Sequence, residues 1–99
     1  MLNSECIEIF EKYLREEKKS SANALSSYLR DIRQFGAYLD LHTDTDIVSA
    51  TEDELSEYIS WLKSQGKSVA TVSRGIASLK CLYSYLTIRQ IIPENPSTK

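Results

Sequence analysis

The chain has 99 residues, of which 41% are hydrophobic and 26% are charged, and its formal net charge is −2. These are ordinary values for one globular domain, and no apolar run approaches the ~20 residues that a membrane-spanning helix needs. The N-terminus lacks a basic region followed by an apolar run, so we expect no secretory signal and a cytoplasmic protein. Only three glycines and two prolines occur, which favours a helical fold over a β-rich one with many tight turns.

The cysteine and histidine content argues against metal chemistry. Cys6 and Cys81 are the only cysteines and His42 is the only histidine, whereas a structural zinc site usually needs four such ligands at close spacing. With no secretory signal we expect two reduced thiols, although a disulfide between them stays open. Motifs such as GxGxxG, the P-loop, HExxH and GxSxG are absent. We therefore expect no cofactor, no metal site and no catalytic residue, and an independent small enzyme is the least favoured interpretation.

Helical periodicity begins near the N-terminus. A first helix is expected from Ser4 to Lys18, with Ser4 as its N-cap. A second helix is expected from Ala22 to Leu41. The spacing i, i+3, i+4, i+7 that predicts its buried face is formed by Leu25, Tyr28, Leu29, Ile32, Phe35, Gly36 and Leu39. A polar connection follows, and Ile47 and Val48 are expected to cover one end of the core.

Two further helices are predicted from capping signals. Thr51 followed by Glu54 is a capping box, so a third helix is expected to start near Thr51 and to end at Gly66. A fourth helix is expected to run from Ser68 to about Ile91, where Pro93 and Pro96 would stop it. The predicted fold class is therefore all-α, a compact bundle of four main helices over residues 1–92. Residues 93–99 are expected to be an extended tail that begins a linker to a further domain.

Charge is distributed unevenly along the chain. From position 40 to position 57 there are seven acidic residues and no lysine or arginine, and from position 58 to position 93 there are five basic residues and no acid. Local potential governs binding more than net charge does, so an acidic chain can still present one basic surface. The alternative is that an acidic and a basic solvated face have simply segregated.

The expected second and fourth helices each carry a polar stripe beside the apolar face. On the second helix this stripe is formed by Ser26, Arg30 and Arg33, with Ser27 nearby. On the fourth helix Thr71, Arg74 and Ser78 share one narrow sector, with Ser68 at its edge and Lys67 just before the helix. Hydroxyl and guanidinium groups are the types that contact phosphates and base edges. Ordinary solvated helix faces explain the same pattern, and helix packing explains Gly75 beside this sector.

The order of motifs in this sequence resembles a known family. NALSSYLRDIRQFGAYL is followed by T-x-x-[DE]-L-x-x-Y, then by G-K-S-x-x-T-x-x-R-x-I-x-S-L-K-x-L-Y-x-Y-L, and finally by N-P. This combination, from about Ser4 to Pro96, is similar to the N-terminal core-binding domain of tyrosine site-specific recombinases. It is most similar to the Xer-type recombinases and phage integrases, whose domain is also described as the SAM-like integrase N-terminal domain.

The resemblance implies a role in DNA recombination or integration. It implies that Ser26, Ser27 and Arg30 face DNA from the second helix and that Thr71, Arg74 and Ser78 do so from the fourth. The implied partners are double-stranded DNA, a catalytic domain of the same polypeptide and neighbouring recombinase subunits on DNA. The catalytic residues of this family belong to that other domain, so we expect them beyond Lys99 and expect no enzymatic activity from this fragment. Ala24, Leu29 and Gly75 depart from the family, which often has polar or basic residues there.

A helical protein–protein or oligomerisation module without DNA binding is the alternative function. In that case the acidic segment from Asp40 to Glu57 would dock a basic partner and Trp61 would anchor the interface. Salt-dependent binding of the chain to duplex DNA would distinguish the two functions.

Overall fold

The computed structural model describes residues 1–97 of the chain, and helices account for nearly all of its regular structure. The four α-helices are α1 (Asn3–Lys12), α2 (Ala22–His42), α3 (Glu52–Ser64) and α4 (Val69–Ile88). A π-helical turn, Tyr13–Glu17, continues α1, and a short 3-10 helix, Ile47–Ser49, lies between α2 and α3. No strand occurs within these 97 residues. The all-α, four-helix architecture expected from the sequence is confirmed.

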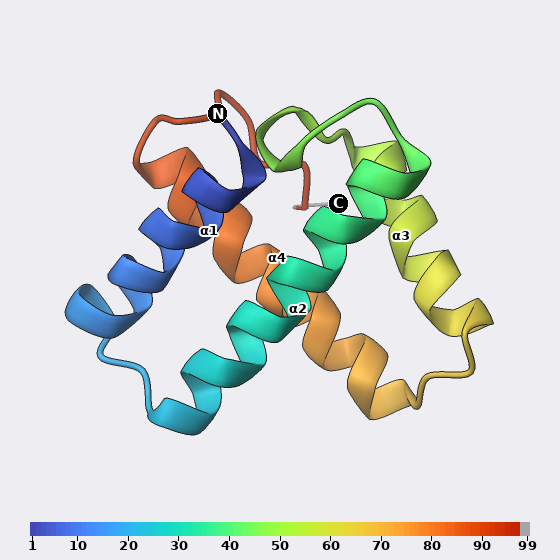
Figure 1. The fold of residues 1–99 in the computed structure, drawn as a ribbon, viewed down its shortest axis with the longest axis horizontal. Helices are drawn as coiled ribbons and strands as arrows, with labels where there is room; N and C mark the ends of the chain where they lie inside the picture. Colours follow the sequence, from blue (N-terminus) through green and yellow to red (C-terminus); the bar gives the residue numbers. More distant parts are fainter. Residues whose placement is uncertain (98–99) are drawn as a thin grey trace.

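The two long helices α2 and α4 cross at the centre of the molecule, and the shorter helices pack at either side. Figure 1 shows α2 running diagonally in front of α4, with α1 on the left and α3 on the right. The packed pairs are α2 with α4, α1 with α2, and α3 with α4. Each of the two long helices therefore has two helical neighbours: α1 and α4 pack on α2, and α2 and α3 pack on α4.

The core fills the space between the crossing helices. Phe10 of α1, Phe35 of α2 and Tyr83 of α4 have no exposed surface. The Phe35 ring lies 4.9 Å from that of Tyr58 in α3, so aromatic side chains from α2, α3 and α4 meet directly. Ile47 is fully buried and Val48 half-buried, as the sequence predicts for a plug at one end of the core.

The first helix starts earlier and ends differently from the expected Ser4–Lys18. The N-cap position is Leu2, whose backbone N–H donates to the Glu5 carboxylate at 3.0 Å, so the expectation that Ser4 is the cap is wrong. Asn3 is drawn into the fold because its side-chain oxygen accepts from the Ile47 N–H at 2.8 Å. After Lys12 the helix widens into the π-helical turn, where the Tyr13 ring stacks on Tyr85 of α4 at 4.4 Å.

The N-termini of α3 and α4 follow the capping signals. Thr51 accepts the Glu54 N–H at 3.2 Å while Glu54 accepts the Thr51 N–H at 2.9 Å, which is the predicted capping box. Ser68 accepts the Thr71 N–H at 3.1 Å and caps α4. Between them, Gly66 has φ of +76°, the left-handed conformation that favours glycine after a helix.

The C-terminus of α4 lies before the prolines rather than at them. The helix ends at Ile88, and Gln90 turns the chain with φ of +59°. The Ile91 N–H donates to the Leu86 carbonyl and the Gln90 N–H to the Thr87 carbonyl, the bond pair of a Schellman motif. The expectation that Pro93 stops the helix near Ile91 is therefore wrong, since local hydrogen bonding ends it first.

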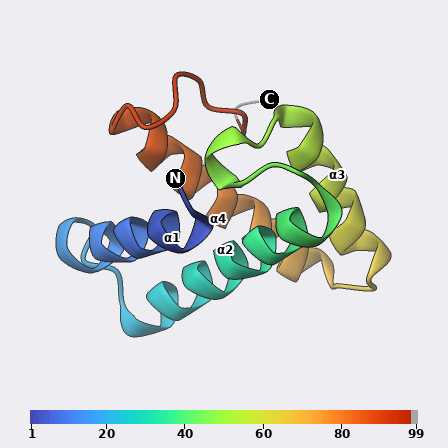
Figure 2. The same cartoon turned by 45° about the horizontal axis from the view of Figure 1, so that its top comes forward.

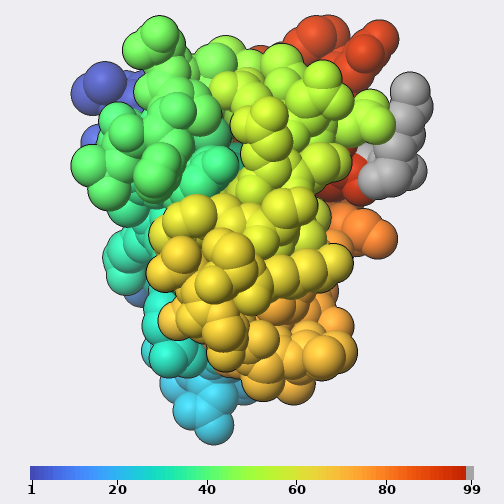
Figure 3. Space-filling view, turned by 90° about the vertical axis from the view of Figure 1, so that its right-hand side faces the viewer, coloured from blue at the N-terminus to red at the C-terminus, as the bar shows by residue number. Residues whose placement is uncertain are grey.

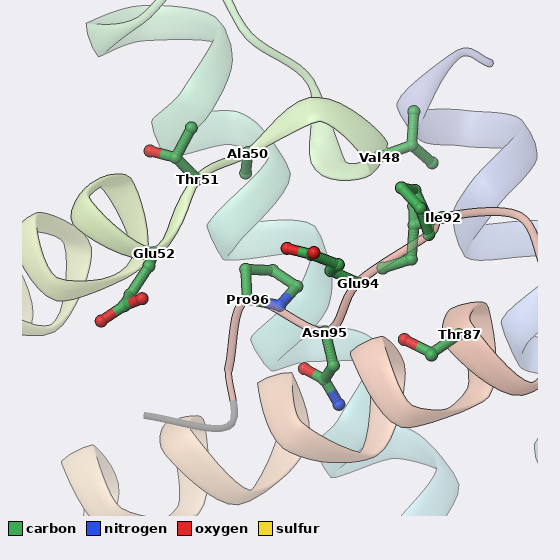
Figure 4. Close-up of a pocket in the computed structure, with 10 residues that line it drawn as sticks. Val48, Ala50, Thr51, Glu52, Thr87, Ile92, Glu94, Asn95 and Pro96 are labelled. Atoms are coloured by element: carbon green, nitrogen blue, oxygen red, sulfur yellow. The ribbon is translucent and has the colours of Figure 1, made fainter.

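The segment after α4 folds back over the body of the molecule. Figure 2 shows it crossing from the end of α4 toward α3. Ile92 is 5% exposed, and the Asn95 side chain donates to the Ser84 hydroxyl at 3.5 Å. Figure 4 shows Ile92, Glu94, Asn95 and Pro96 lining an open pocket opposite the segment that leads into α3. The described part of the expected linker is thus packed rather than extended, and its residues Thr98 and Lys99 lie outside the described residues.

Residues 1–97 contain no helix typical of a membrane span and no cluster typical of a metal site. Within them no helix combines the length and the apolar character that crossing a bilayer requires. They also hold no group of three or more His, Cys, Asp or Glu side chains arranged to bind a metal ion. Cys6 is buried, Cys81 is half-buried, and both are free thiols.

Candidate nucleic-acid interface

The N-termini of α2 and α4 lie at the same end of the molecule. Figure 1 shows both helices starting at its lower edge, α2 on the left and α4 on the right, and Figure 3 shows both starts at the bottom of the adjoining face. Ser21 caps α2 by accepting the Ala24 N–H at 3.2 Å, and Ser68 caps α4 in the same way. Two helix dipoles therefore direct their positive ends toward the same end of the molecule, at two separate places on its surface.

No acidic side chain occupies the first turn of α2 or of α4. By contrast, the first turn of α3 holds three acids, which offset the positive end of that helix. Lys19 precedes the cap of α2 and Lys67 precedes the cap of α4, and both are exposed. Free backbone N–H groups, a helix dipole and an adjacent ammonium group together favour an anion such as a phosphate.

The acidic segment lies at the other end of the molecule. The connection from α2 to α3, which carries Asp44 and Asp46, and the start of α3 are at the upper edge of Figure 1, away from the N-termini of α2 and α4. The acidic connection is thus separated in space from Lys19 and Lys67, although Arg89 lies at the far end of α4. A chain of net charge −2 can therefore present a positive potential at one end.

The residues that the sequence singled out on α2 differ in exposure. Ser26, Arg30 and Arg33 are exposed, whereas Ser27 is half-buried. One Arg33 nitrogen lies 4.0 Å from a carboxylate oxygen of Glu11 in α1, with 61% of the Arg33 side chain exposed. Such an exposed pair holds the arginine only weakly, so Arg30 and Arg33 both stay accessible to a ligand.

On α4 the predicted residues divide into a surface group and an interior group. Lys67 and Ser68 are exposed, and the Ser68 hydroxyl donates to that of Thr71 at 2.9 Å. Ser78 has no exposed surface, so the expectation that it faces a ligand is wrong. Thr71, Arg74 and Ser78 share one sector of α4. Farther from the start of the helix this sector faces α2, because α4 crosses α2 there.

A hydrogen-bonded cluster of Asp31, Arg74 and Ser78 joins α2 to α4. Arg74 Nε donates to Asp31 Oδ2 and Nη2 donates to Oδ1, each at 3.1 Å. The Ser78 hydroxyl donates to Asp31 Oδ2 at 2.8 Å. The Asp31 side chain is 7% exposed and that of Arg74 is 41% exposed, so the carboxylate is interior while the guanidinium reaches the surface. The hydrogen bonds and the charge of Asp31 raise the pKa of Arg74, which keeps it protonated.

Asp31 was not among the candidate residues, although the sequence carries a signal for it. It stands three residues after Tyr28 and four before Phe35, which places an acid on the apolar stripe of α2. A charged residue at such a position is almost never buried without a partner. Arg74 and Ser78 are four residues apart, so both side chains lie on one face of α4. This spacing identifies them as the partners of Asp31 only when the crossing of α2 and α4 is known.

Two of the three departures from the family pattern lie inside the protein. Leu29 is 6% exposed, and Gly75 is buried where an added Cβ would meet Leu62 of α3 at 3.5 Å. A Cβ at position 75 would make only an ordinary van der Waals contact with Leu62, so packing of α4 on α3 does not require the glycine. Ala24, at the start of α2, is half-exposed. The three departures therefore remove few polar or basic side chains from the exposed surface.

Comparison with known families assigns the chain. Residues 7–90 match the model of the phage integrase, N-terminal SAM-like domain. The match covers most of the chain, and the four-helix fold agrees with it. The chain therefore belongs to the phage integrase N-terminal SAM-like domain family.

Relatives of this chain are named as tyrosine recombinases. A Caldanaerobacter subterraneus protein of that name is 41% identical over 88 residues, covering 89% of this chain and 30% of the relative. Tyrosine recombinase XerD of Oceanobacillus iheyensis is 40% identical over 92% of this chain and 31% of its own length. Tyrosine recombinase XerC of Lacticaseibacillus casei is 30% identical over 91% of this chain and 30% of its own. The chain thus spans about a third of these relatives, and no solved structure is significantly similar to it.

Proposed function

We propose that this domain binds duplex DNA through the N-terminal halves of α2 and α4 during site-specific recombination. The observation that carries the proposal is the pair of capped, acid-free helix N-termini at one end of the molecule, each with a lysine beside it. The residues that would contact DNA are those of the sequence prediction that reach the surface: Ser26, Ser27, Arg30, Arg33, Lys67, Ser68, Thr71 and Arg74.

Most of the affinity would come from phosphates. Backbone N–H groups at the two helix starts and the side chains of Arg30, Arg33 and Lys67 supply positive charge, and these side chains have no buried carboxylate partner among residues 1–97. With about three to five phosphates engaged, the logarithm of the association constant should fall with the logarithm of salt concentration at a slope of about −3 to −4. The acidic end would keep the domain from binding in the reverse orientation.

The names of the relatives extend the proposal to the whole protein. We infer that the polypeptide to which this domain belongs is a tyrosine recombinase whose strand-exchange residues lie beyond Lys99. The domain itself would hold DNA without catalysing the reaction, and it would act beside the catalytic domain and neighbouring recombinase subunits. The alternative is a protein-binding module anchored by Trp61, but this residue offers a partner only part of its surface, because it is half-buried and its ring lies 5.2 Å from that of Tyr38.

Fluorescence anisotropy of the chain with labelled duplex DNA tests DNA binding. We expect the Arg30→Ala variant to weaken binding and to make the salt slope shallower by about 1, the effect of losing one phosphate contact. Arg89→Ala is the matched control, because Arg89 is exposed at the opposite end of α4, and 20 residues of helix separate the ends by about 30 Å. Equal losses in both variants, or binding that does not depend on salt, would contradict the proposed interface.

A further inference from the structure

We propose that Asp31 is a positioning residue that presents the outer edge of the Arg74 guanidinium to a base, so that Arg74 contributes sequence selectivity rather than general phosphate binding. The inference rests on the proposed DNA-binding function and assigns separate roles to cations on the same surface. Its structural basis is the junction of α2 and α4, where one buried carboxylate receives three hydrogen bonds.

The geometry of the pair leaves one side of the guanidinium free. Arginine has five N–H donors in a planar fork. Asp31 takes the Nε–H and one Nη2–H, both at 3.1 Å, which is the side-on bidentate arrangement. The remaining donors are two on Nη1 and one on Nη2, and 41% of the Arg74 side chain is exposed. Two parallel N–H groups, one from each Nη, therefore remain on an edge of the guanidinium that Asp31 does not occupy.

The position of Asp31 is itself held firmly. Its carboxylate is 7% exposed, and the fully buried Ser78 donates its hydroxyl to the oxygen that also accepts from Arg74 Nε. Because Asp31 belongs to α2 while Arg74 and Ser78 belong to α4, the guanidinium plane is set by the crossing of the two helices. An arginine without such a partner samples many rotamers and loses that freedom on binding, whereas Arg74 is already ordered.

The charge of Asp31 separates Arg74 from the other cations. The carboxylate neutralises the guanidinium locally, so Arg74 releases few counterions when DNA binds and adds little to general affinity. Its fixed outer edge matches two acceptors in one plane, as guanine O6 and N7 offer in the major groove. Arg30 and Lys67 are exposed and have no comparable partner within residues 1–97, so they suit phosphates, whose positions vary little with sequence.

Selection from a pool of random-sequence duplexes with the full 99-residue chain tests the inference. The enriched duplex and a scrambled version of it are then compared with each variant by anisotropy. We expect Arg74→Ala to lower affinity for the enriched duplex by about 5- to 100-fold and to change that for the scrambled duplex by less than about twofold.

Asp31→Asn is the decisive variant because it keeps the shape of the side chain and removes its charge. We expect it to lower the ratio of enriched to scrambled affinity and to steepen the salt slope on the scrambled duplex by about 1, since the released Arg74 then binds phosphate. In the Asp31→Asn, Arg74→Ala double variant the ratio should equal that of Arg74→Ala alone, which a purely structural role of Asp31 would not produce. Arg89→Ala should leave the ratio unchanged.

Each other outcome overturns the inference in a distinguishable way. If the unmodified chain binds no duplex, both the proposed function and this inference fail. If it binds DNA without sequence preference, or if Arg74→Ala weakens both duplexes equally, only the inference fails. Should Asp31→Asn not fold, NMR of the unmodified chain decides: the Nε–H of Arg74 must exchange with water far more slowly than that of Arg89, and equal exchange would refute the pairing.

Discussion

Single polar side chains hold the interior of this domain together. Every buried side-chain nitrogen or oxygen within residues 1–97 has a hydrogen-bond partner. Besides the Asp31 cluster, the main example is Tyr83, which is fully buried and donates its hydroxyl to the Ile47 carbonyl at 2.7 Å. This bond ties α4 to the short 3-10 helix between α2 and α3. Burial raises the pKa of Tyr83 well above its usual range, so the hydroxyl stays a donor at any physiological pH.

Removal of the Tyr83 hydroxyl should destabilise the fold without disturbing its packing. We expect Tyr83→Phe to lower the free energy of unfolding by about 1–2 kcal/mol, because the Ile47 carbonyl then has no side-chain donor in a dry site. Urea unfolding followed by circular dichroism measures this change. Tyr13→Phe is the control, since the Tyr13 hydroxyl makes no hydrogen bond within residues 1–97, and an equal loss in both variants would contradict the prediction.

The N-terminus of α3 is held by several hydrogen bonds to the Glu54 carboxylate. Partial burial acts to raise the pKa of Glu54, but three hydrogen bonds outweigh it and hold that pKa below its ordinary value of 4.5. They come from the Thr45 hydroxyl at 2.7 Å, the Thr51 N–H at 2.9 Å and the Thr51 hydroxyl at 3.2 Å. Glu54 therefore caps α3 and also fastens the preceding connection to it.

This cap should make stability depend on pH in a defined window. Because the folded chain binds the Glu54 proton less readily than the unfolded chain, the stabilisation is complete above the ordinary pKa of 4.5 and is lost as pH falls through the lower folded value. We expect Glu54→Gln to cost about 1 kcal/mol at pH 7, with a difference from the unmodified chain that shrinks below about pH 4.5. Melting curves across this range check it, with Asp53→Asn, an exposed acid in the same turn, as the control. A difference independent of pH would refute it.

At the scale of the whole molecule, one small core supports two ends of opposite charge. The molecule measures 35 × 29 × 24 Å, and the crossing of α2 and α4 lies between the basic N-termini and the acidic connection. Cys6 lies on the buried face of α1 and has no exposed surface. Burial, with a further contribution from the Asp46 carboxylate, raises the pKa of Cys6 to about 11. Its thiol is therefore protected both by access and by protonation.

Alkylation of Cys6 should consequently report opening of the whole fold. In the Cys81→Ser variant, which leaves Cys6 as the single thiol, we expect iodoacetamide at pH 8 to react at least about 1000-fold more slowly in buffer than in denaturant. In the unmodified chain, peptide mapping should find Cys81 modified first, because it is half-buried. Reaction of Cys6 at the rate of Cys81 would show that the N-terminal helix opens independently of the core.

The sequence by itself determined the elements whose signals are local. A helix start depends on a cap and the next three residues, so Thr51 and Ser68 were located correctly. A buried face depends on spacing along one helix, so Phe35, Leu39 and Leu82 were placed in the core. The motif order placed the chain in its family for the same reason, since each motif is a local pattern. Ser4 failed as a cap because Asn3 bonds with Ile47, 44 residues away along the chain.

Only the tertiary structure decided which polar stripe reaches the surface. A helical wheel places Arg74 and Ser78 on one sector of α4, but whether that sector meets solvent or another helix depends on where α2 crosses it. The crossing buries Ser78, brings Asp31 to Arg74 and leaves Arg30 and Lys67 exposed. Pairing between groups 43 residues apart leaves no periodic trace in the chain, because it arises from packing two helices and not from the geometry of either one.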